Sequence, residues 1–375
     1  MTLLSRLQDL LSSRHGKIRG VNLGGWLVLE QWITPSVFKQ FEGAPDGRKA
    51  GDEYTFCQVL GEHEARRQLE HHWQTWVTEQ DIQKLHSYGI NLLRIPVGHW
   101  VLHSHPSEPY VTGSYHYLLN AIEWAEKYHM KVIIDIHTAP GSQNGFDNSG
   151  RAGPIEWMND PANVARSVEV VRELAAKFSD RKYASTVVMI QPLNEPASWA
   201  LDLNRVINFY DQCYSAVRQS SSSMTLLFSD AFHDFTDWPN LRKPHWKNVV
   251  IDTHIYNCFT DEHLQATPRD HLERIESYSQ RIQAASRKIP VVVGEWSLDT
   301  TACYKGYCRA TTMGDGDWNK HNAPSDKCTC EMEHDLSRFT HAYKRLLHQM
   351  AVRQLNAFEK GAGWIYWNFK TESNP

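Results

Sequence analysis

Eight short apolar runs alternate with longer helical patterns along the 375-residue chain, and no other feature restricts the fold as strongly. We predict strands over these ranges: Ile18–Leu23, Asn91–Val97, Lys131–His137, Val187–Asn194, Thr225–Ser229, Val249–Ile255, Pro290–Glu295 and Gly363–Asn368. Apolar strands joined by helices are typical of a parallel sheet that is buried on both faces. The sequence therefore predicts an α/β fold, a single (β/α)8 TIM barrel, in preference to an open doubly wound sheet.

Helical patterns fill most segments between the predicted strands. They cover Glu79–Tyr88, Tyr115–His129, Pro161–Phe178, Leu203–Ser220, Pro268–Ser286 and Leu336–Lys360. The fifth crossover is interrupted by Pro239 and Pro244, which leaves room for only a short helix. No helical pattern follows the last strand, so we expect the eighth helix to be missing from this chain. Leucines at helical spacing predict an amphipathic helix over residues 1–17, packed on a catalytic domain of residues 18–375.

Composition narrows the classes of ligand. The net charge is −4 and no Lys/Arg cluster stands out, so we expect no nucleic-acid partner. No apolar stretch reaches the length of about 18 residues that a transmembrane helix needs. The chain has 14 Trp, 15 Tyr and 20 His, and such flat, partly polar rings suit ligands with apolar faces and hydroxyl edges, such as sugars.

Two carboxylates follow predicted strands on opposite sides of the barrel. Glu195 ends the fourth strand in an Asn-Glu-Pro motif, and Glu295 ends the seventh in a Gly-Glu-Trp motif. The C-terminal ends of barrel strands meet at one mouth, where the active sites of such barrels lie. Hydrolysis of a glycosidic bond needs two carboxyl groups, one protonated and one ionised. We therefore predict that Glu195 and Glu295 are catalytic.

These motifs belong to a larger set, which also includes Arg19–Glu30, Arg94–Val97 and Gly141–Gly150. In this set and its order the chain closely resembles glycoside hydrolase family 5, and within it the fungal-type exo-β-1,3-glucanase branch. The resemblance extends from about residue 19 to residue 372. It implies a retaining hydrolase that releases glucose from a β-1,3-glucan. We expect a monomer that uses no cofactor and no metal.

The resemblance also implies a role for each site residue. Glu195 is the acid/base and Glu295 the nucleophile, with carboxyl groups about 5 to 5.5 Å apart. Arg94 pairs with Glu295 and favours its ionised form, while burial and the neighbouring carboxylate keep Glu195 protonated. The other predicted substrate-binding residues are Asn194, His137, His254 and Tyr256 around the reacting ring, Trp367 beneath it, Glu30 at the blind end of the pocket, and Phe146 with Phe259 as an aromatic clamp at the entrance.

Departures from the family pattern leave the substrate open. Gln31 stands where the family usually has proline, and Ile255 replaces a common histidine. The alternatives are a β-glucosidase that acts on lipid-linked glucosides (glucosylceramide or steryl glucoside), a catalytically silent carbohydrate-binding barrel, and a metal-dependent barrel enzyme. Four other indoles are predicted to pack in the core and not to bind sugar: Trp26, Trp100, Trp199 and Trp296.

Four of the seven cysteines lie in an insertion over about 297–335. A long irregular loop gains from a covalent link, so we predict one or two disulfides, with Cys303 paired to Cys328 or Cys330. The alternative is a four-thiolate zinc site, although one residue between Cys328 and Cys330 is fewer than structural zinc pairs use. The thiol-rich loop and the resemblance favour an extracellular or cell-wall location. Without a signal peptide before Met1, a cytoplasmic location stays open.

Overall fold

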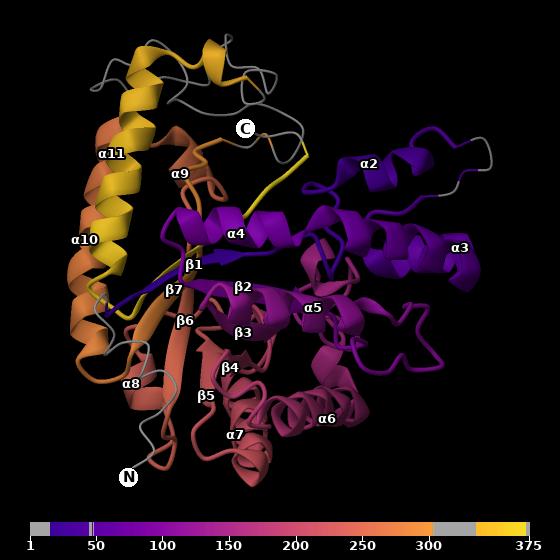
Figure 1. Cartoon of the computed structure of the whole chain (residues 1–375). Helices are drawn as coiled ribbons and strands as arrows, with labels where there is room; N and C mark the ends of the chain where they lie inside the picture. Colours follow the sequence, from indigo (N-terminus) through magenta and orange to yellow (C-terminus); the bar gives the residue numbers. More distant parts are fainter. Residues whose placement is uncertain (1–15, 45–46, 48, 302, 304–334, 373–375) are drawn as a thin grey trace.

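A computed structural model of the chain describes residues 16–44, 47, 49–301, 303 and 335–372. Within these residues, eight parallel strands close into a barrel in chain order, with β8 paired to β1 (Figure 1). The strands are β1 (Ile18–Asn22), β2 (Leu92–Val97), β3 (Lys131–Ile136), β4 (Val187–Gln191), β5 (Thr225–Ser229), β6 (Val249–Ile255), β7 (Val291–Trp296) and β8 (Gly363–Tyr366). The predicted fold class is confirmed, and every predicted strand overlaps an observed one.

Helices surround the barrel, and most of them match the sequence prediction. They are α2 (Pro35–Phe38), α3 (Glu53–Trp76), α4 (Glu79–Ser87), α5 (Ser114–Lys127), α6 (Pro161–Phe178), α7 (Leu203–Ser220), α8 (Trp238–Leu241), α9 (Asp261–Gln265), α10 (Pro268–Ser286) and α11 (His341–Phe358). Figure 1 shows α10 and α11 side by side along one flank, and α6 beside α7 on another. The short α8 confirms the expectation for the fifth crossover. Within the described residues, none of these helices combines the length and apolar character needed to cross a membrane.

The structure differs from the prediction at α3 and at the beginning of α11. The long helix α3 was not predicted, and its regular pattern is broken by Gly61, whose φ of 72° and ψ of 163° kink the helix. The predicted helix over Leu336–Lys360 is wrong at its beginning, because Leu336–Arg338 form a separate 3-10 turn. Thr340 then caps α11 by accepting a hydrogen bond from the backbone N–H of Tyr343. The N-cap at Thr340 therefore marks the beginning of α11, separate from the 3-10 turn before it.

Three sequence predictions fall on residues that the structure does not describe. The amphipathic helix over 1–17 lies almost wholly among them, and so does most of the insertion over 297–335. The predicted disulfide partners Cys328 and Cys330 are in that insertion. In the described part, Cys57 and Cys213 are buried free thiols, and Cys258 is buried as well.

The barrel interior consists of an apolar layer below a polar one. The apolar layer is a cluster of buried side chains: Ile18, Leu92, Ile133, Val188, Met189, Leu227, Val250, Val292, Ala362 and Ile365. Side chains alternate along a strand, so the residue two positions further on points to the same interior. That next layer is polar and fully buried: Asn22, Arg94, Asp135, Gln191 and Asp252. The strands therefore place charged groups directly beneath the mouth of the barrel.

The predicted packing of four indoles is confirmed for three of them. Trp26, Trp100 and Trp296 are buried, and the Trp26 Nε1 donates to the backbone oxygen of Trp73 at 2.8 Å. The prediction is wrong for Trp199, whose side chain is 58% exposed. Trp199 lies in the loop after β4, and such loops run over the barrel surface where no second layer covers them.

The N-terminus of α3 supports the segment that follows β1. Glu53 is fully buried and accepts a hydrogen bond at 2.8 Å from the backbone N–H of Leu29. Its neighbour Asp52 forms a β-bridge with Glu30. Burial raises the pKa of Glu53 to about 8. A protonated carboxyl group thus anchors the chain beside Glu30.

The Glu53→Gln replacement should stabilise the protein increasingly as pH rises from about 4.5 to about 8. The folded carboxyl group keeps its proton up to a pKa of about 8, whereas the unfolded chain ionises near 4.5, so the parent loses stability across this window. Glutamine does not ionise and avoids that loss, which is on the order of a few kcal/mol at most. Melting temperatures of both proteins should diverge with pH. Parallel curves would contradict the buried acid, and Glu62→Gln on the exposed face of α3 is the control.

Candidate active site

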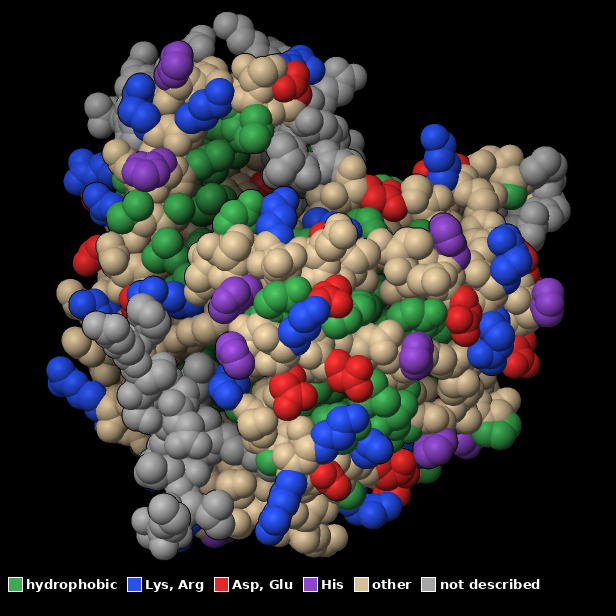
Figure 2. Space-filling view, viewed as in Figure 1, with side chains coloured by type: hydrophobic (Ala, Val, Ile, Leu, Met, Phe, Trp, Pro, Cys, Tyr) green, Lys and Arg blue, Asp and Glu red, His purple; other side chains and the backbone are tan. Residues whose placement is uncertain are grey.

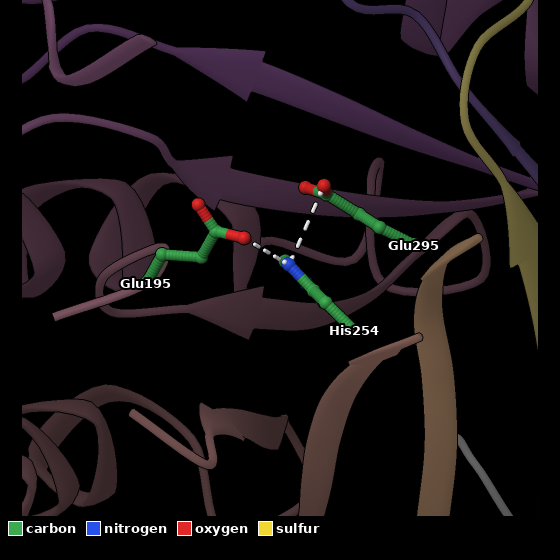
Figure 3. Close-up of side chains that lie close together, drawn as sticks. All are labelled: Glu195, His254 and Glu295. Carbon is green, nitrogen blue, oxygen red and sulfur yellow. Dashed lines mark hydrogen bonds and ion pairs between the residues drawn. The ribbon is translucent and has the colours of Figure 1, made fainter. Parts of the chain in front are cut away.

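Glu195, His254 and Glu295 meet at the C-terminal mouth of the barrel. Figure 3 shows the two carboxylates pointing toward one another with the His254 ring between them. The His254 Nδ1 lies 2.6 Å from the Glu195 Oε1 and 3.4 Å from the Glu295 Oε2. One oxygen from each carboxylate and a ring nitrogen of His254 all lie within 4.8 Å of one another. The carboxylate pair expected from the sequence is therefore assembled in one site.

Arg94 holds Glu295 from below. Its Nη1 donates to the Glu295 Oε1 at 2.8 Å, and its Nη2 lies 3.1 Å from the Asp135 Oδ2. The same Nη2 donates to the Asn194 Oδ1 at 2.8 Å. On the other side, the Tyr256 hydroxyl donates to the Glu295 Oε2 at 2.8 Å. Both oxygens of Glu295 are thus bound by donors that favour its ionised form.

Asp252 holds the far side of the His254 ring. Its Oδ2 lies 3.1 Å from the His254 Nε2 and accepts a hydrogen bond at 2.7 Å from Gln191. A register shift between Thr253 and His254 in the pairing of β6 with β7 brings His254 opposite Glu295. Gly294 leaves the space for this arrangement, because a Cβ there would lie 1.9 Å from the Asp252 Oδ1. The irregular register and the glycine together create the site.

A second aspartate–histidine pair lies on β3. The His137 Nδ1 is 2.6 Å from the Asp135 Oδ2, and its Nε2 is 3.4 Å from the Asn194 side-chain nitrogen. The His137 ring stacks on Trp367, with centroids 5.7 Å apart and an angle of 9° between the planes. Trp367 is 7% exposed. These residues form a flat wall beside the carboxylate pair.

Glu30 lies deep in the structure at 2% exposure. Burial, with the negative charges of Asp147 and Glu295, raises its pKa well above the usual value. Trp32 donates to its Oε2 at 3.2 Å, while its Oε1 has no hydrogen-bond partner among the described residues. The Glu30 Oε1 can therefore take part in a further hydrogen bond, close enough to Glu295 to feel its charge.

The predicted entrance pair, Phe146 and Phe259, is exposed. Their exposures are 44% and 50%. The Phe146 ring contacts Trp199 at a centroid distance of 6.0 Å, and the Phe259 ring contacts Tyr256 at 4.9 Å. The two phenylalanines thus contact different aromatic neighbours, Trp199 and Tyr256.

The backbone at Glu195 is strained. Its φ is 45°, in the left-handed region that side chains other than glycine rarely occupy. Asn148 donates to the Glu195 Oε2 at 3.4 Å from the segment that follows β3. Strain of this kind costs roughly 1–3 kcal/mol and persists where the surroundings impose it. The strained turn directs the Glu195 side chain toward His254.

The surroundings of the two carboxylates shift their pKa values in different directions. Burial acts to raise the pKa of Glu195, but the hydrogen bond and charge of His254 outweigh it, so this pKa lies below the usual value. Burial raises the pKa of Glu295 against the charges of His254 and Arg94. The two carboxylates and the His254 ring are close enough to share protons as one unit. The expected division, with Glu195 protonated and Glu295 ionised, stays a prediction.

His254 carries the proton of this cluster. Burial acts to lower its pKa, but the charges of Glu295 and Asp252 raise it well above the usual value. Glu195, His254 and Glu295 are near enough to offer three ligand atoms to a metal ion. The guanidinium of Arg94 already binds Glu295 with a fixed positive charge.

Several functional neighbours were missed in the sequence analysis. They are the buried polar residues Asn22, Asp135, Gln191 and Asp252. A signal was present, since Asp135 and Asp252 each precede a histidine by two positions at the end of an apolar strand. A charge inside a buried strand requires a partner. The exposed Trp199 carried no such signal, because nothing local separates a loop indole from a buried one.

The comparisons with known proteins agree with this geometry. The family described as cellulase (glycosyl hydrolase family 5) matches residues 57–322. Glucan 1,3-beta-glucosidase 1 of Schizosaccharomyces pombe is 38% identical over 359 residues, which cover 95% of this chain and 83% of that protein. Glucan 1,3-beta-glucosidase of Blumeria graminis is 38% identical over 379 residues, which cover 99% of this chain and 86% of the relative.

Solved structures share the architecture. The rutinosidase from Aspergillus niger superposes with a TM-score of 0.75 at 25% identity, covering 96% of this chain and 91% of that one. Endoglucanase Cel5A from Thermotoga maritima superposes with a TM-score of 0.56 at 17% identity, covering 99% and 94%. At that identity the second likeness concerns the fold alone.

The Asp252→Asn replacement should lower the pKa of His254 by about one unit or more, because it removes a negative charge next to the ring. An NMR titration of the His254 ring measures this. Asp211→Asn is the matched control, since Asp211 lies 2.7 Å from His245 on the surface. This variant should leave the titration of His254 unchanged. An unchanged His254 titration in the Asp252 variant would contradict the role of Asp252.

Proposed function

This chain belongs to glycosyl hydrolase family 5, and on that basis we propose that it is a retaining exo-β-1,3-glucanase that releases glucose from β-1,3-glucan. The names of the Schizosaccharomyces pombe and Blumeria graminis relatives support the linkage and the product. The observation that carries the proposal is the carboxylate pair. Oxygens of Glu195 and Glu295 approach within 4.8 Å on either side of His254.

The separation of the carboxylates supports the retaining mechanism. Retaining glycosidases hold their two carboxyl groups about 5 to 5.5 Å apart, whereas inverting enzymes leave roughly 6.5 to 9.5 Å for a water molecule. One oxygen of Glu195 and one of Glu295 lie within 4.8 Å of each other, which is nearer to the retaining separation than to the inverting one. We infer that one carboxylate attacks the sugar directly.

We assign the nucleophile to Glu295 and the acid/base to Glu195. In the first step a Glu295 oxygen bonds the anomeric carbon, the bond to the leaving oxygen breaks, and Glu195 gives that oxygen a proton. His254 supplies the proton to Glu195 across their 2.6 Å contact, since the proton of the free protein resides on the ring. Arg94 and Tyr256 keep Glu295 oriented for attack.

The second step releases the sugar. A water molecule attacks the anomeric carbon, gives its proton to Glu195, and the bond to Glu295 breaks. Each displacement inverts the carbon, so the product keeps the β configuration. Asn194 is suited to hold the 2-hydroxyl group, because Arg94 fixes its side-chain oxygen and leaves the amide group to donate.

Exo action rests on the closed end of the site. Trp367 and His137 form a flat wall on which a glucose ring can stack. We propose that the unpartnered Oε1 of Glu30 accepts a hydroxyl of the terminal glucose. Phe146 and Phe259, at the open side, would then flank the departing unit.

Two alternatives are less well supported. A silent binding barrel would not need a strained Glu195 backbone and a buried proton at His254. A metal ion bound at Glu295 would compete with the positive charge of Arg94, which already pairs with that carboxylate. For location we propose the extracellular space or the cell wall, as expected for an enzyme of a glucan polymer with a thiol-rich insertion.

Replacing each carboxylate should separate their roles. Glu295→Ala should lose roughly 10⁴-fold or more in kcat on laminarin, because no covalent intermediate can form. Glu195→Ala should lose roughly 10² to 10⁴-fold on laminarin and far less on β-glucosyl fluoride, whose leaving group needs no proton. Added azide should give β-glucosyl azide with Glu195→Ala and α-glucosyl azide with Glu295→Ala.

The control for this experiment replaces a carboxylate on the surface. Glu173→Gln, at a surface carboxylate that lies 3.2 Å from the exposed His103, should behave like the parent. Activity of both alanine variants at the parental rate, or azide products of the opposite configuration, would contradict the assignment.

The substrate is tested by product analysis. Laminarin should yield glucose as the first and main product, with the β anomer appearing first in the NMR spectrum. A glucosylceramide and a rutinoside, the latter suggested by the name of the Aspergillus niger structure, are the comparison substrates. Glucose release from the glycolipid alone would overturn β-1,3-glucan as the substrate.

A further inference from the structure

A buried glutamine links two segments of the site from behind. Gln143 lies in the segment that follows β3 and is fully buried. Its Nε2 donates to two backbone oxygens, that of His137 at 2.8 Å and that of Asn194 at 2.9 Å. Its Oε1 accepts a hydrogen bond from the backbone N–H of Ala139 at 2.9 Å. The amide thus uses both its N–H groups and its oxygen inside the protein. Gln143 has no role in the function proposed above.

The contacts of Gln143 lie on both sides of the acid/base along the chain. The Asn194 oxygen belongs to the peptide group that joins Asn194 to Glu195, so the orientation of this group helps to set the Glu195 φ of 45°. After Pro196, the backbone N–H of Ala197 donates to the backbone oxygen of Gln143 at 3.1 Å. Pro196 further restricts the backbone of the residue before it. Gln143 therefore holds the turn around Glu195 at both ends.

The left-handed backbone of Glu195 needs support of this kind. Such strain persists only where the surrounding structure imposes it. His254 and Asn148 contact the Glu195 carboxylate, at 2.6 Å and 3.4 Å, whereas Gln143 contacts the backbone on either side of the residue. Without the hydrogen bond from Gln143, we expect the peptide group before Glu195 to turn toward a relaxed conformation. That rotation would carry the carboxyl group away from its place at the mouth.

The segment that carries Gln143 is itself held in place. Ser142, directly before it, is buried and has a left-handed φ of 63°. The Ser142 Oγ accepts a hydrogen bond from the backbone N–H of Gly145 at 2.9 Å, and its backbone oxygen accepts one from the N–H of Trp157 at 3.2 Å. These contacts fix the backbone from which the Gln143 side chain extends. A side chain on a fixed backbone can in turn fix the turn that it binds.

We propose that Gln143 is a positioning residue for the acid/base, whose buried amide fixes the turn at Glu195 so that the carboxyl group points at the leaving oxygen. The inference rests on the proposed hydrolysis and adds a residue that acts through Glu195 without touching the substrate. A carboxamide suits this place because it offers two donors and one acceptor in one planar group. An ionised carboxylate has no donor, and a methionine side chain has neither donor.

The experiment compares Gln143→Met with the parent on β-glucosides that differ in their leaving group. On phenyl β-glucoside and laminarin, whose leaving oxygens need a proton, kcat/KM should fall roughly 10- to 100-fold, because a displacement of about 1 Å can cost on the order of 10²-fold. On 2,4-dinitrophenyl β-glucoside and β-glucosyl fluoride, whose leaving groups need no proton, kcat/KM should stay within about threefold of the parent. A purely structural role would lower the values on all four substrates together.

A matched control lies at the opposite end of the barrel. Asn91, directly before β2, also binds two backbone groups: its Nδ2 donates to the Lys17 oxygen at 2.9 Å, and its Oδ1 accepts from the Arg19 N–H at 2.9 Å. Asn91→Leu removes these hydrogen bonds far from the mouth. Both variants should lower the melting temperature, since each leaves backbone polar groups without partners. Only Gln143→Met should change the dependence of kcat/KM on the leaving group.

A milder variant keeps the test decisive if Gln143→Met does not fold. Gln143→Asn retains the amide on a shorter side chain and should show the same selective loss to a smaller extent. Equal losses on every leaving group, or parental values on all of them, would overturn the proposal. The same selective loss in Asn91→Leu would also overturn it, by tracing the effect to lowered stability. Failure of the proposed function is distinguishable, because the parent would then leave laminarin intact while the aryl β-glucosides still report on Glu195.

Discussion

The buried guanidinium of Arg94 organises the centre of the barrel. Arg94 is fully buried, and its donors reach side chains from four other strands and from the turn after β4: Asn22, Asp135, Gln191, Asn194 and Glu295. A buried cation is tolerated only when its hydrogen bonds are satisfied and its charge is paired. The neighbouring strands must therefore keep their register, because a shift of one residue would turn these partners away. The same contacts that satisfy Arg94 fix Glu295 at the mouth.

The electrostatics of the site follow from this arrangement and not from either carboxylate alone. Asp135 and Asp252 each hold a histidine, and His254 places its proton between Glu195 and Glu295. A proton on the ring lowers the pKa of the nearer carboxylate against the effect of burial. In the proposed mechanism, Glu195 receives its proton from His254, which lies one hydrogen bond away. The loops after β4 and β5 contain residues with left-handed φ angles and present aromatic rings to solvent.

Much of the fold and the centre of the site could be predicted from the sequence. Apolar runs between helical patterns located all the strands that the structure describes, and the strand-end rule brought Glu195, Glu295 and Arg94 to one mouth. Interruptions within a helical pattern were missed, and so were features that depend on a distant partner. The helix α3 is interrupted at Gly61, and α11 begins three residues after a 3-10 turn, because local caps and kinks compete with a continuous pattern. Trp199 was wrongly assigned to the core, because the burial of a residue depends on which other segments cover it.

The sequence by itself determined the barrel, the order of its strands and the identity of the groups at their ends, because an apolar run between two helical patterns is a local property of each segment. Only the tertiary structure decided which groups touch. The register shift between β6 and β7 and the open space at Gly294 bring His254 into contact with both Glu195 and Glu295. Coulomb energy and desolvation depend on distances of a few ångströms between residues that are a hundred positions apart, and no local pattern encodes them.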